Sequence, residues 1–215
     1  MASPGRIPEA TVARLPLYLR GLDAFPVGVT ATVSSDELAD LAGVNAAKVR
    51  KDLSHLGTYG TRGVGYDATF LRFQISLALG VANVWPVVVC GMGNLGRALA
   101  NHTGFTDRGF PVVAATDSDP DKIGTIVDGV PVHAPSQLGD IVRRFDVAIG
   151  VISTPAGAAQ GTADALVAAG VTSIMSFAPT VLSAPDEVEI RSVDLATELQ
   201  ILGFHLHRSR IAGDS

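Results

Sequence analysis

Three glycines with the spacing of a phosphate-binding turn, Gly91, Gly93 and Gly96, form the first pattern that indicates chemistry. The apolar run PVVVC (86–90) leads directly into them and predicts a buried strand, and NLGRALANH (94–102) predicts the helix that follows. In that setting Gly91 permits a tight turn, Gly93 lets the backbone approach a pyrophosphate, and Gly96 lets helix and strand pack closely. The glycines alone would be a weak signal, but the strand–turn–helix context predicts a dinucleotide site at the positive end of the helix.

A second apolar run, PVVAATD (111–117), ends in an acid, and Asp117 lies 21 residues beyond Gly96. A carboxylate at that place accepts hydrogen bonds from the adenosine ribose hydroxyls and repels a 2′-phosphate. We therefore expect NADH and NAD+ as ligands rather than their phosphorylated counterparts. The alternative is a Rossmann-like domain whose site is empty or serves a different nucleotide.

Strand and helix patterns continue to alternate toward the C-terminus, which predicts an α/β fold with a doubly wound, parallel sheet. Proline loops follow the runs DVAIGVIS (146–153) and VTSIMSF (171–177). Both loops would lie at carboxyl ends of parallel strands, where such sheets bind ligands, so we expect them to frame the nicotinamide. Phe177 has an alternative interpretation as a core residue. The expected cofactor-binding residues are Gly91, Gly93, Asn94, Leu95, Gly96, Asp117, Lys122, Thr154, Pro155, Phe177, Ala178 and Pro179.

The first 85 residues carry helix signals of a different kind. SSDELADLAGV (34–44) predicts a short helix, with Ser34 and Glu37 at capping-box spacing and both leucines facing inward. A two-residue turn leads to Asn45, which can cap a further helix over AAKVRKDLSHLG (46–57). A helix, a tight turn and a second helix make a helix-turn-helix motif.

The helix over 46–57 has one apolar and one basic side. At about 100° per residue, Val49, Leu53 and Leu56 lie together. The opposite face is small, basic and hydrogen-bonding, as a helix that enters the major groove of DNA requires. An ordinary solvated face is the alternative for this helix alone. The expected DNA-binding residues are Asn45, Lys48, Arg50, Lys51, Ser54 and, from the next segment, Arg62.

That next segment, GTYGTRGVGY (57–66), predicts a small hairpin because glycine turns separate strand-forming residues. A hairpin directly after a recognition helix is the wing of a winged-helix domain, and Arg62 near its tip could reach a phosphate or the minor groove. An apolar helix over 8–25, kinked at Pro16, and another capped by Asp67 complete this domain.

Composition places any basic surface in the N-terminal part. The 215-residue chain has a net charge of −5, but residues 1–86 carry eight basic and seven acidic side chains, against eight and fourteen in residues 87–215. One cysteine, Cys90, and five scattered histidines predict neither a disulfide framework nor a metal site. No apolar run approaches the ~20 residues of a membrane span, and no signal-peptide pattern is present, so we expect a soluble cytoplasmic protein without membrane contact.

The predicted domain lengths argue against an enzyme. We expect a DNA-binding domain over 1–84, a nucleotide domain over 85–193 and a C-terminal dimerisation helix and tail over 194–215. A dehydrogenase needs a substrate pocket and a proton donor or acceptor, and no part of the chain remains to build them. The dinucleotide would then act as a signal. The alternatives are a small NAD-dependent oxidoreductase and a winged-helix regulator of another nucleotide, such as a coenzyme A derivative.

Together these features resemble the Rex family of bacterial redox-sensing transcriptional repressors, over about residues 7–207. The resemblance implies a homodimer that binds a pseudo-palindromic operator through two winged helices and releases it when NADH, but not NAD+, is bound. It also implies that the C-terminal helix is domain-swapped. It is carried by RLPLYLR (14–20), VRKDLSHLGTYGTRGVGY (49–66), VCGMGNLGRALAN (89–101), DSDPDKIG (117–124), STPA (153–156), SFAP (176–179) and VDLATELQ (193–200).

The resemblance further implies a switch in which Arg14 and Asp194 form a cofactor-sensitive pair. Two positions depart from the family pattern. His102 stands where many relatives have a tyrosine near the nicotinamide that takes part in the switch, and Ser176 stands where they commonly have asparagine. These departures concern the switch and its redox set point, and not the fold.

Overall fold

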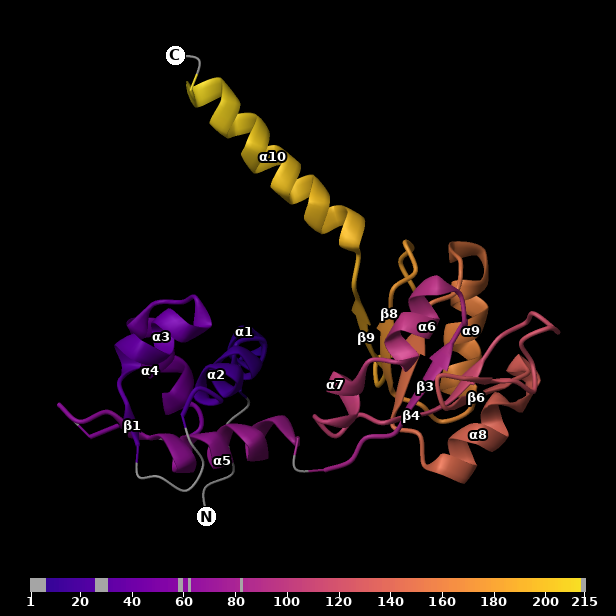
Figure 1. Cartoon of the computed structure of the whole chain (residues 1–215), viewed down its shortest axis with the longest axis horizontal. Helices are drawn as coiled ribbons and strands as arrows, with labels where there is room; N and C mark the ends of the chain where they lie inside the picture. Colours follow the sequence, from indigo (N-terminus) through magenta and orange to yellow (C-terminus); the bar gives the residue numbers. More distant parts are fainter. Residues whose placement is uncertain (1–6, 26–30, 58–59, 62, 82, 214–215) are drawn as a thin grey trace. The chain divides into compact units, whose positions relative to one another are not determined.

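The computed structural model describes residues 7–25, 31–57, 60–61, 63–81 and 83–213. They belong to two compact units, Met1–Asn83 and Val84–Ser215. Figure 1 shows the order of helices and strands along the chain. Within the described ranges, no helix has both the length and the apolar character needed to cross a bilayer.

The N-terminal unit is a small helical domain with a short sheet. The helix predicted over 8–25 is divided in two, because Pro16 occupies the first turn of its second part, where a missing N–H costs no helical bond. Leu15, Tyr18 and Leu22 from that second part are buried in the core, whereas Val12 is exposed. The elements are α1 (Glu9–Val12), α2 (Leu15–Leu22), β1 (Thr32–Val33), α3 (Ser35–Ala42), α4 (Ala46–Ser54), β2 (Tyr66–Asp67) and α5 (Ala68–Leu79).

The predicted helix caps are confirmed. Ser34 and Glu37 form the reciprocal capping box of α3, and the side chains of Asn45 and Asp67 accept hydrogen bonds from the first turns of α4 and α5. These bonds satisfy N–H groups that a helix leaves without a partner. The prediction that both leucines of α3 face inward is half wrong, because Leu41 is 44% exposed.

The segment predicted as a wing is partly described. Thr61 and Gly65 form an antiparallel bridge around a tight turn. Tyr66 pairs with Val33 of β1, a long-range partner that the local pattern could not indicate. Gly65 has φ +102°, and a Cβ there would lie 2.5 Å from the Val33 carbonyl oxygen, so glycine permits this approach. Arg62, expected at the tip, lies outside the described residues.

The second unit contains a doubly wound sheet in the order β5-β6-β4-β3-β7-β8-β9, and all neighbours are parallel except β5 and β6. The α/β fold class and the Rossmann-type sheet are thus confirmed. The strands are β3 (Val87–Cys90), β4 (Val112–Thr116), β5 (Ile126–Val127), β6 (Val130–His133), β7 (Ile149–Ile152), β8 (Ser173–Ser176) and β9 (Glu189–Ser192).

Helices cover both faces of this sheet. Alternate residues of β3 enter two cores: Val88 and Cys90 pack with the apolar faces of α8 and α9, and Val87 and Val89 pack on the side of α6. The helices are α6 (Asn94–Ala100), α7 (Thr103–Thr106), α8 (Leu138–Phe145), α9 (Ala156–Ala168) and α10 (Leu195–Gly213), with a 3₁₀ turn at Pro135–Gln137.

The C-terminal helix α10 leaves its apolar residues uncovered. Every side chain from Leu195 to Ile211 is exposed, and Leu199 and Leu202 are 68% and 63% exposed. The helix itself is as predicted. Its apolar stripe has no covering surface among the described residues of this single chain.

Candidate dinucleotide site and DNA-binding surface

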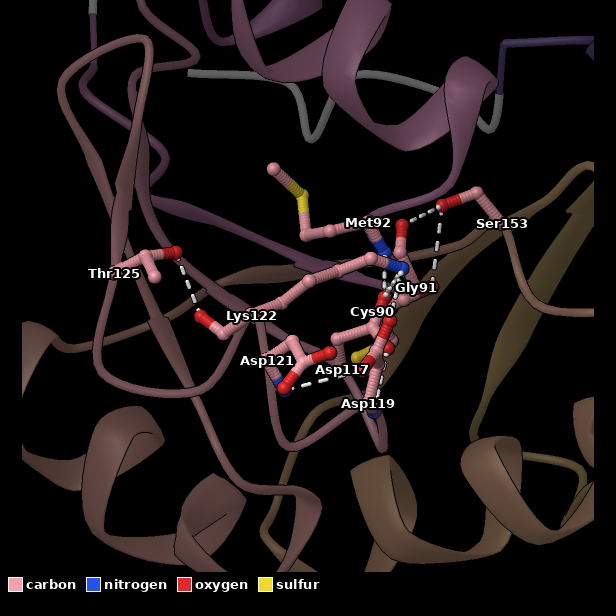
Figure 2. A network of polar contacts seen from close by, with 9 residues as sticks. All are labelled: Cys90, Gly91, Met92, Asp117, Asp119, Asp121, Lys122, Thr125 and Ser153. Atoms are coloured by element: carbon pink, nitrogen blue, oxygen red, sulfur yellow. Dashed lines mark hydrogen bonds and ion pairs between the residues drawn. The ribbon is translucent and has the colours of Figure 1, made fainter.

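The loops after β3 and β7 meet at the point where the strand order reverses. β3 pairs with β4 on one side and with β7 on the other, so the chain leaves these strands in opposite directions and opens a crevice at their carboxyl ends. The Ser153 hydroxyl donates to the carbonyl of Gly91 at 2.7 Å and that of Cys90 at 3.2 Å (Figure 2). Gly91 has φ +98°, and a Cβ would lie 2.9 Å from the Ser153 carbonyl carbon. Gly91 is therefore required by the close approach of these two loops.

The other two glycines have different reasons. A Cβ on Gly96 would lie 1.8 Å from the Gly91 carbonyl oxygen, so the start of α6 can pack on the turn only with glycine. Gly93 has an ordinary backbone conformation, φ −75° and ψ −167°, and a Cβ there would meet no atom within 4 Å. The fold does not require glycine at position 93. A ligand that packs closely against this backbone needs the open space beside it.

Asp117 connects the second strand to the glycine turn. Its Oδ2 accepts hydrogen bonds from the Met92 N–H at 2.7 Å and the Lys122 ammonium at 3.1 Å, and its Oδ1 accepts one from the Asp119 N–H at 2.8 Å (Figure 2). Burial opposes ionisation of Asp117, but these donors together hold its pKa below the usual range. Since each carboxylate oxygen accepts about two hydrogen bonds, Oδ1 retains a position for a ribose hydroxyl.

A cavity of about 740 Å³ lies against these loops. The Oγ1 of Thr154, on its wall, is buried and has no hydrogen-bond partner within the described ranges. An unpaired buried hydroxyl is costly unless a ligand or water satisfies it, so Thr154, Gly93 and Asp117 together fit a dinucleotide. The lining comprises Cys90, Gly91, Gly93, Thr116, Asp117, Ser118, Lys122, Pro135, Leu138, Ser153, Thr154, Pro155, Ala158, Gly161, Thr162 and Ala165.

The cavity brings together six of the twelve residues expected at the cofactor: Gly91, Gly93, Asp117, Lys122, Thr154 and Pro155. Asn94, Leu95 and Gly96 form the first turn of α6 next to it. Phe177, Ala178 and Pro179 follow β8, on the far side of β7, and Phe177 packs against a core cluster. The nicotinamide role of these three remains a prediction. Sequence reasoning missed the wall contributed by α8 and α9, whose small and apolar residues carry no local motif.

The DNA-binding residues expected on α4 share its exposed side. Lys48, Arg50, Lys51 and Ser54 are exposed, and Val49 and Leu53 on the other side are fully buried. Asn45 caps the helix through Lys48 N–H, and the Ser54 hydroxyl donates to the Lys51 carbonyl oxygen at 2.7 Å.

Arg50 borders a separate hollow of about 400 Å³ between the start of α3 and residues 60–61 and 63–66 of the segment predicted as a wing. This placement suits a cation that contacts the DNA backbone at the edge of an interface. Base contacts are then left to the side chains at the centre of the exposed face.

Replacing Lys51 with alanine should weaken DNA binding, and a phosphate contact by Lys51 would show as a slope of log affinity against log salt that is smaller by about one, since each phosphate contact releases about one counterion. Affinity for NADH should not change. Arg20→Ala, which removes an equal charge from the exposed surface of α2, is the control. An equal loss of DNA affinity in both variants would show that α4 has no special role.

Asp52, also on α4, is almost fully buried, at 1% exposure. Its oxygens accept hydrogen bonds from Thr11 Oγ1 at 2.8 Å, Arg14 Nε at 2.6 Å, Arg14 Nη2 at 2.7 Å and Tyr18 Oη at 2.6 Å. Burial alone would raise the pKa of Asp52, but the hydrogen bonds of Arg14, Tyr18 and Thr11 lower it to about 2. Burial, and then the bond to Asp52, raise the pKa of Tyr18 to about 12.

The lowered pKa of Asp52 predicts an acid-sensitive contribution to folding. Because the folded-state pKa lies below the ordinary value of 3.8, the contribution is complete above about pH 4 and is lost as the pH falls toward 2. Its size is about 2 kcal/mol. Carboxyl-carbon NMR of the intact protein should show Asp52 titrating near pH 2, and a midpoint near pH 4 would contradict this assignment.

The expected switch residues have other partners within this chain. Arg14 is bound to Asp52, and Asp194 accepts hydrogen bonds from the first turn of α10, including the Thr197 hydroxyl at 2.9 Å. His102 precedes α7, and its ring lies edge-on to Phe105 at 4.7 Å. A pair between Arg14 and Asp194, and a switch role for His102, remain predictions.

Comparison with known proteins places these features in one family. Two family models match: "Putative DNA-binding protein N-terminus" over residues 6–54 and "CoA binding domain" over residues 83–180. The redox-sensing transcriptional repressor Rex of Streptomyces avermitilis is 61% identical, over 94% of this chain and 80% of that protein.

Two solved structures are similar to this chain over nearly its whole length. RSP, a Rex-family repressor, in complex with β-NAD+ and operator DNA has a TM-score of 0.89 at 32% identity, over 97% of this chain and 96% of that one. RSP in complex with β-NADH has a TM-score of 0.84 at 31% identity, over 97% and 98% of the two chains.

Proposed function

The chain belongs to the Rex family of redox-sensing transcriptional repressors, and we propose that it binds operator DNA through α4 and releases it when NADH occupies the cavity beside Asp117. One observation carries the proposal: a single chain combines a capped helix with an exposed basic face and a dinucleotide-sized cavity at the switch point of a Rossmann sheet. RSP, similar over nearly its full length, has been crystallised with β-NAD+ and operator DNA and with β-NADH.

The cavity residues would hold the part that both redox forms share. The backbone at Gly91 and Gly93 would face the pyrophosphate, Asp117 would accept from the ribose, and the Thr154 hydroxyl would gain a partner. When bound, the dinucleotide supplies a nicotinamide that is cationic when oxidised and neutral when reduced. If only NADH releases DNA, the DNA-free form of the protein must bind the reduced nicotinamide more tightly than the DNA-bound form does. A coupling of about 3 kcal/mol would change DNA affinity by about 150-fold.

We infer that the protein acts as a homodimer joined through α10. The exposed leucines at 195, 199, 202 and 206 repeat at helical spacing, and an uncovered stripe of this kind is typical of a helix that packs on another subunit. A two-fold dimer presents two α4 helices to two half-sites about one helical turn apart, which matches a pseudo-palindromic operator. Exchange of α10 between the two copies is part of this proposal.

The proposal is of a regulator and not of an oxidoreductase. Curated relatives that are similar over most of their length are repressors. The match to a CoA-binding family model keeps coenzyme A derivatives as the second candidate ligands. The Asp117 carboxylate beside the cavity favours an unmodified ribose over such phosphorylated ligands. We place the protein in the cytoplasm, where the DNA that it would bind is found.

DNA binding itself can be tested without knowledge of the operator. Nucleotide-free protein is used to select duplexes from a random pool, and the affinity for the selected duplex is compared with that for a scrambled one. We expect a palindromic site bound at least about a thousandfold more tightly than the scrambled duplex. Failure to enrich any sequence would contradict the proposed function.

A further inference from the structure

The buried carboxylate of Asp52 is unusual because it lies on the helix that carries the DNA-binding residues. A charge in a protein interior is costly unless it is paired and hydrogen-bonded. Here two oxygens accept four hydrogen bonds, from Thr11, Arg14 and Tyr18, so every acceptor position is filled. The exposed face of α4 does not require a buried carboxylate, so another role is needed to account for Asp52.

All four donors come from one segment outside the helix-turn-helix motif. Thr11 lies in α1, Arg14 in the break before α2, and Tyr18 in α2. The guanidinium of Arg14 binds both oxygens at once, a geometry that fixes the orientation of the carboxylate as well as its distance. The network therefore ties α4 directly to the α1–α2 segment by directional bonds.

Because of the place of Asp52 on α4, these bonds can restrict rotation of α4 about its own axis. By helical spacing Asp52 lies about 60° from Val49 on the buried side and about 40° from Lys48 on the basic side. The apolar contacts of Val49 and Leu53 hold α4 in the core, but burial of apolar area is not directional and resists rotation about the helix axis weakly. Bonds at the flank would resist that rotation, and rotation would move Lys48 and Lys51 out of register with the bases of the selected duplex.

We propose that Asp52 is a positioning residue for operator recognition: held by Thr11, Arg14 and Tyr18, it sets the rotation of α4 without touching DNA. The inference rests on the proposed function. Arg14 is the partly accessible member, with its side chain 24% exposed against 2% for Asp52. Arg14 is thus the partner whose loss would loosen the helix while the apolar core stays packed.

Asp52→Asn tests the proposal because the proposal and a simple charge effect predict opposite changes in DNA affinity. The substitution keeps the side-chain shape and makes the domain one unit more positive, so a simple charge effect would strengthen DNA binding. The proposal expects the opposite, an affinity for the selected duplex weaker by about tenfold. Asp40→Asn, an exposed acid on α3, makes the same charge change as a control and should bind as tightly as the wild type or slightly more tightly.

The ratio of the affinity for the selected duplex to that for the scrambled duplex distinguishes a change in the rotation of α4 from a loss of folded protein. A partly unfolded population would lower both affinities by the same factor, whereas a rotated α4 lowers binding to the selected duplex and spares the scrambled one. Binding of Asp52→Asn equal to that of Asp40→Asn, or an unchanged ratio, would overturn the proposal. Absence of sequence-specific binding by the wild type would instead reject the proposed function.

Tyr18→Phe keeps the test decisive if Asp52→Asn does not fold. It removes one hydroxyl, which donates to Asp52 Oδ2, and keeps the buried ring. We expect a loss of about threefold to tenfold in the specificity ratio, since the bonds from Thr11 and Arg14 to Asp52 remain. A ratio equal to that of the wild type would overturn the proposal.

Discussion

Replacing Gly93 with alanine should weaken binding of both NADH and NAD+ by about a hundredfold or more, because a methyl group there would displace the pyrophosphate from N–H donors worth about 1.5–3 kcal/mol each. The unfolding temperature should not fall, since a Cβ at this position meets no protein atom within 4 Å and the backbone φ is −75°. Isothermal titration and thermal unfolding of the same samples measure both quantities.

Gly139→Ala is the matched control for this prediction. It also adds one methyl to the second unit, on α8, where the nearest atom is the end of the Arg143 side chain at 3.5 Å. Its dinucleotide affinity should equal that of the wild type. Undiminished binding by Gly93→Ala would mean that the dinucleotide does not approach this turn.

Replacing Asp117 with alanine should weaken binding of NADH and NAD+ by about thirtyfold, which corresponds to about 2 kcal/mol for hydrogen bonds to a charged acceptor. Discrimination against NADPH should also fall, since the carboxylate that repels a 2′-phosphate is gone and Lys122 keeps only its longer ion pair, with Asp119 at 3.5 Å. The measurement is a competition titration of NADH against NADPH.

Asp121→Ala removes an equal charge from the same loop, where Asp121 is exposed, and should leave both affinities unchanged. DNA binding by nucleotide-free Asp117→Ala should match that of the wild type. Loss of DNA binding at equal stability would contradict the assignment of Asp117 to the dinucleotide.

Sequence predicted the parts of this molecule that depend on neighbours along the chain. The caps at Ser34, Asn45 and Asp67 were predictable because a cap and the N–H it binds lie within three residues. The glycine turn was predictable because strand, turn and helix are contiguous. Asp117 followed from its fixed distance beyond that turn.

The parts that were missed depend on partners distant in sequence. Asp52 reads locally as one acid in a basic helix, and its burial follows from donors 34 to 41 residues away. The pairing of Tyr66 with Val33 is likewise long-range. Strand β9 was not predicted. In its sequence the charged residues Glu189 and Arg191 flank Ile190. An edge strand with charged, exposed residues lacks the apolar pattern that identifies a buried strand.

The central claim, that this chain converts the NADH to NAD+ ratio into DNA release, is tested most directly by fluorescence anisotropy of the selected duplex. NADH is titrated into the protein–DNA complex in the presence of excess NAD+. We predict that DNA is released as NADH rises and that NAD+ alone, at any concentration used, leaves the complex intact. A complex that persists at saturating NADH, or that NAD+ dissociates equally well, would contradict the account.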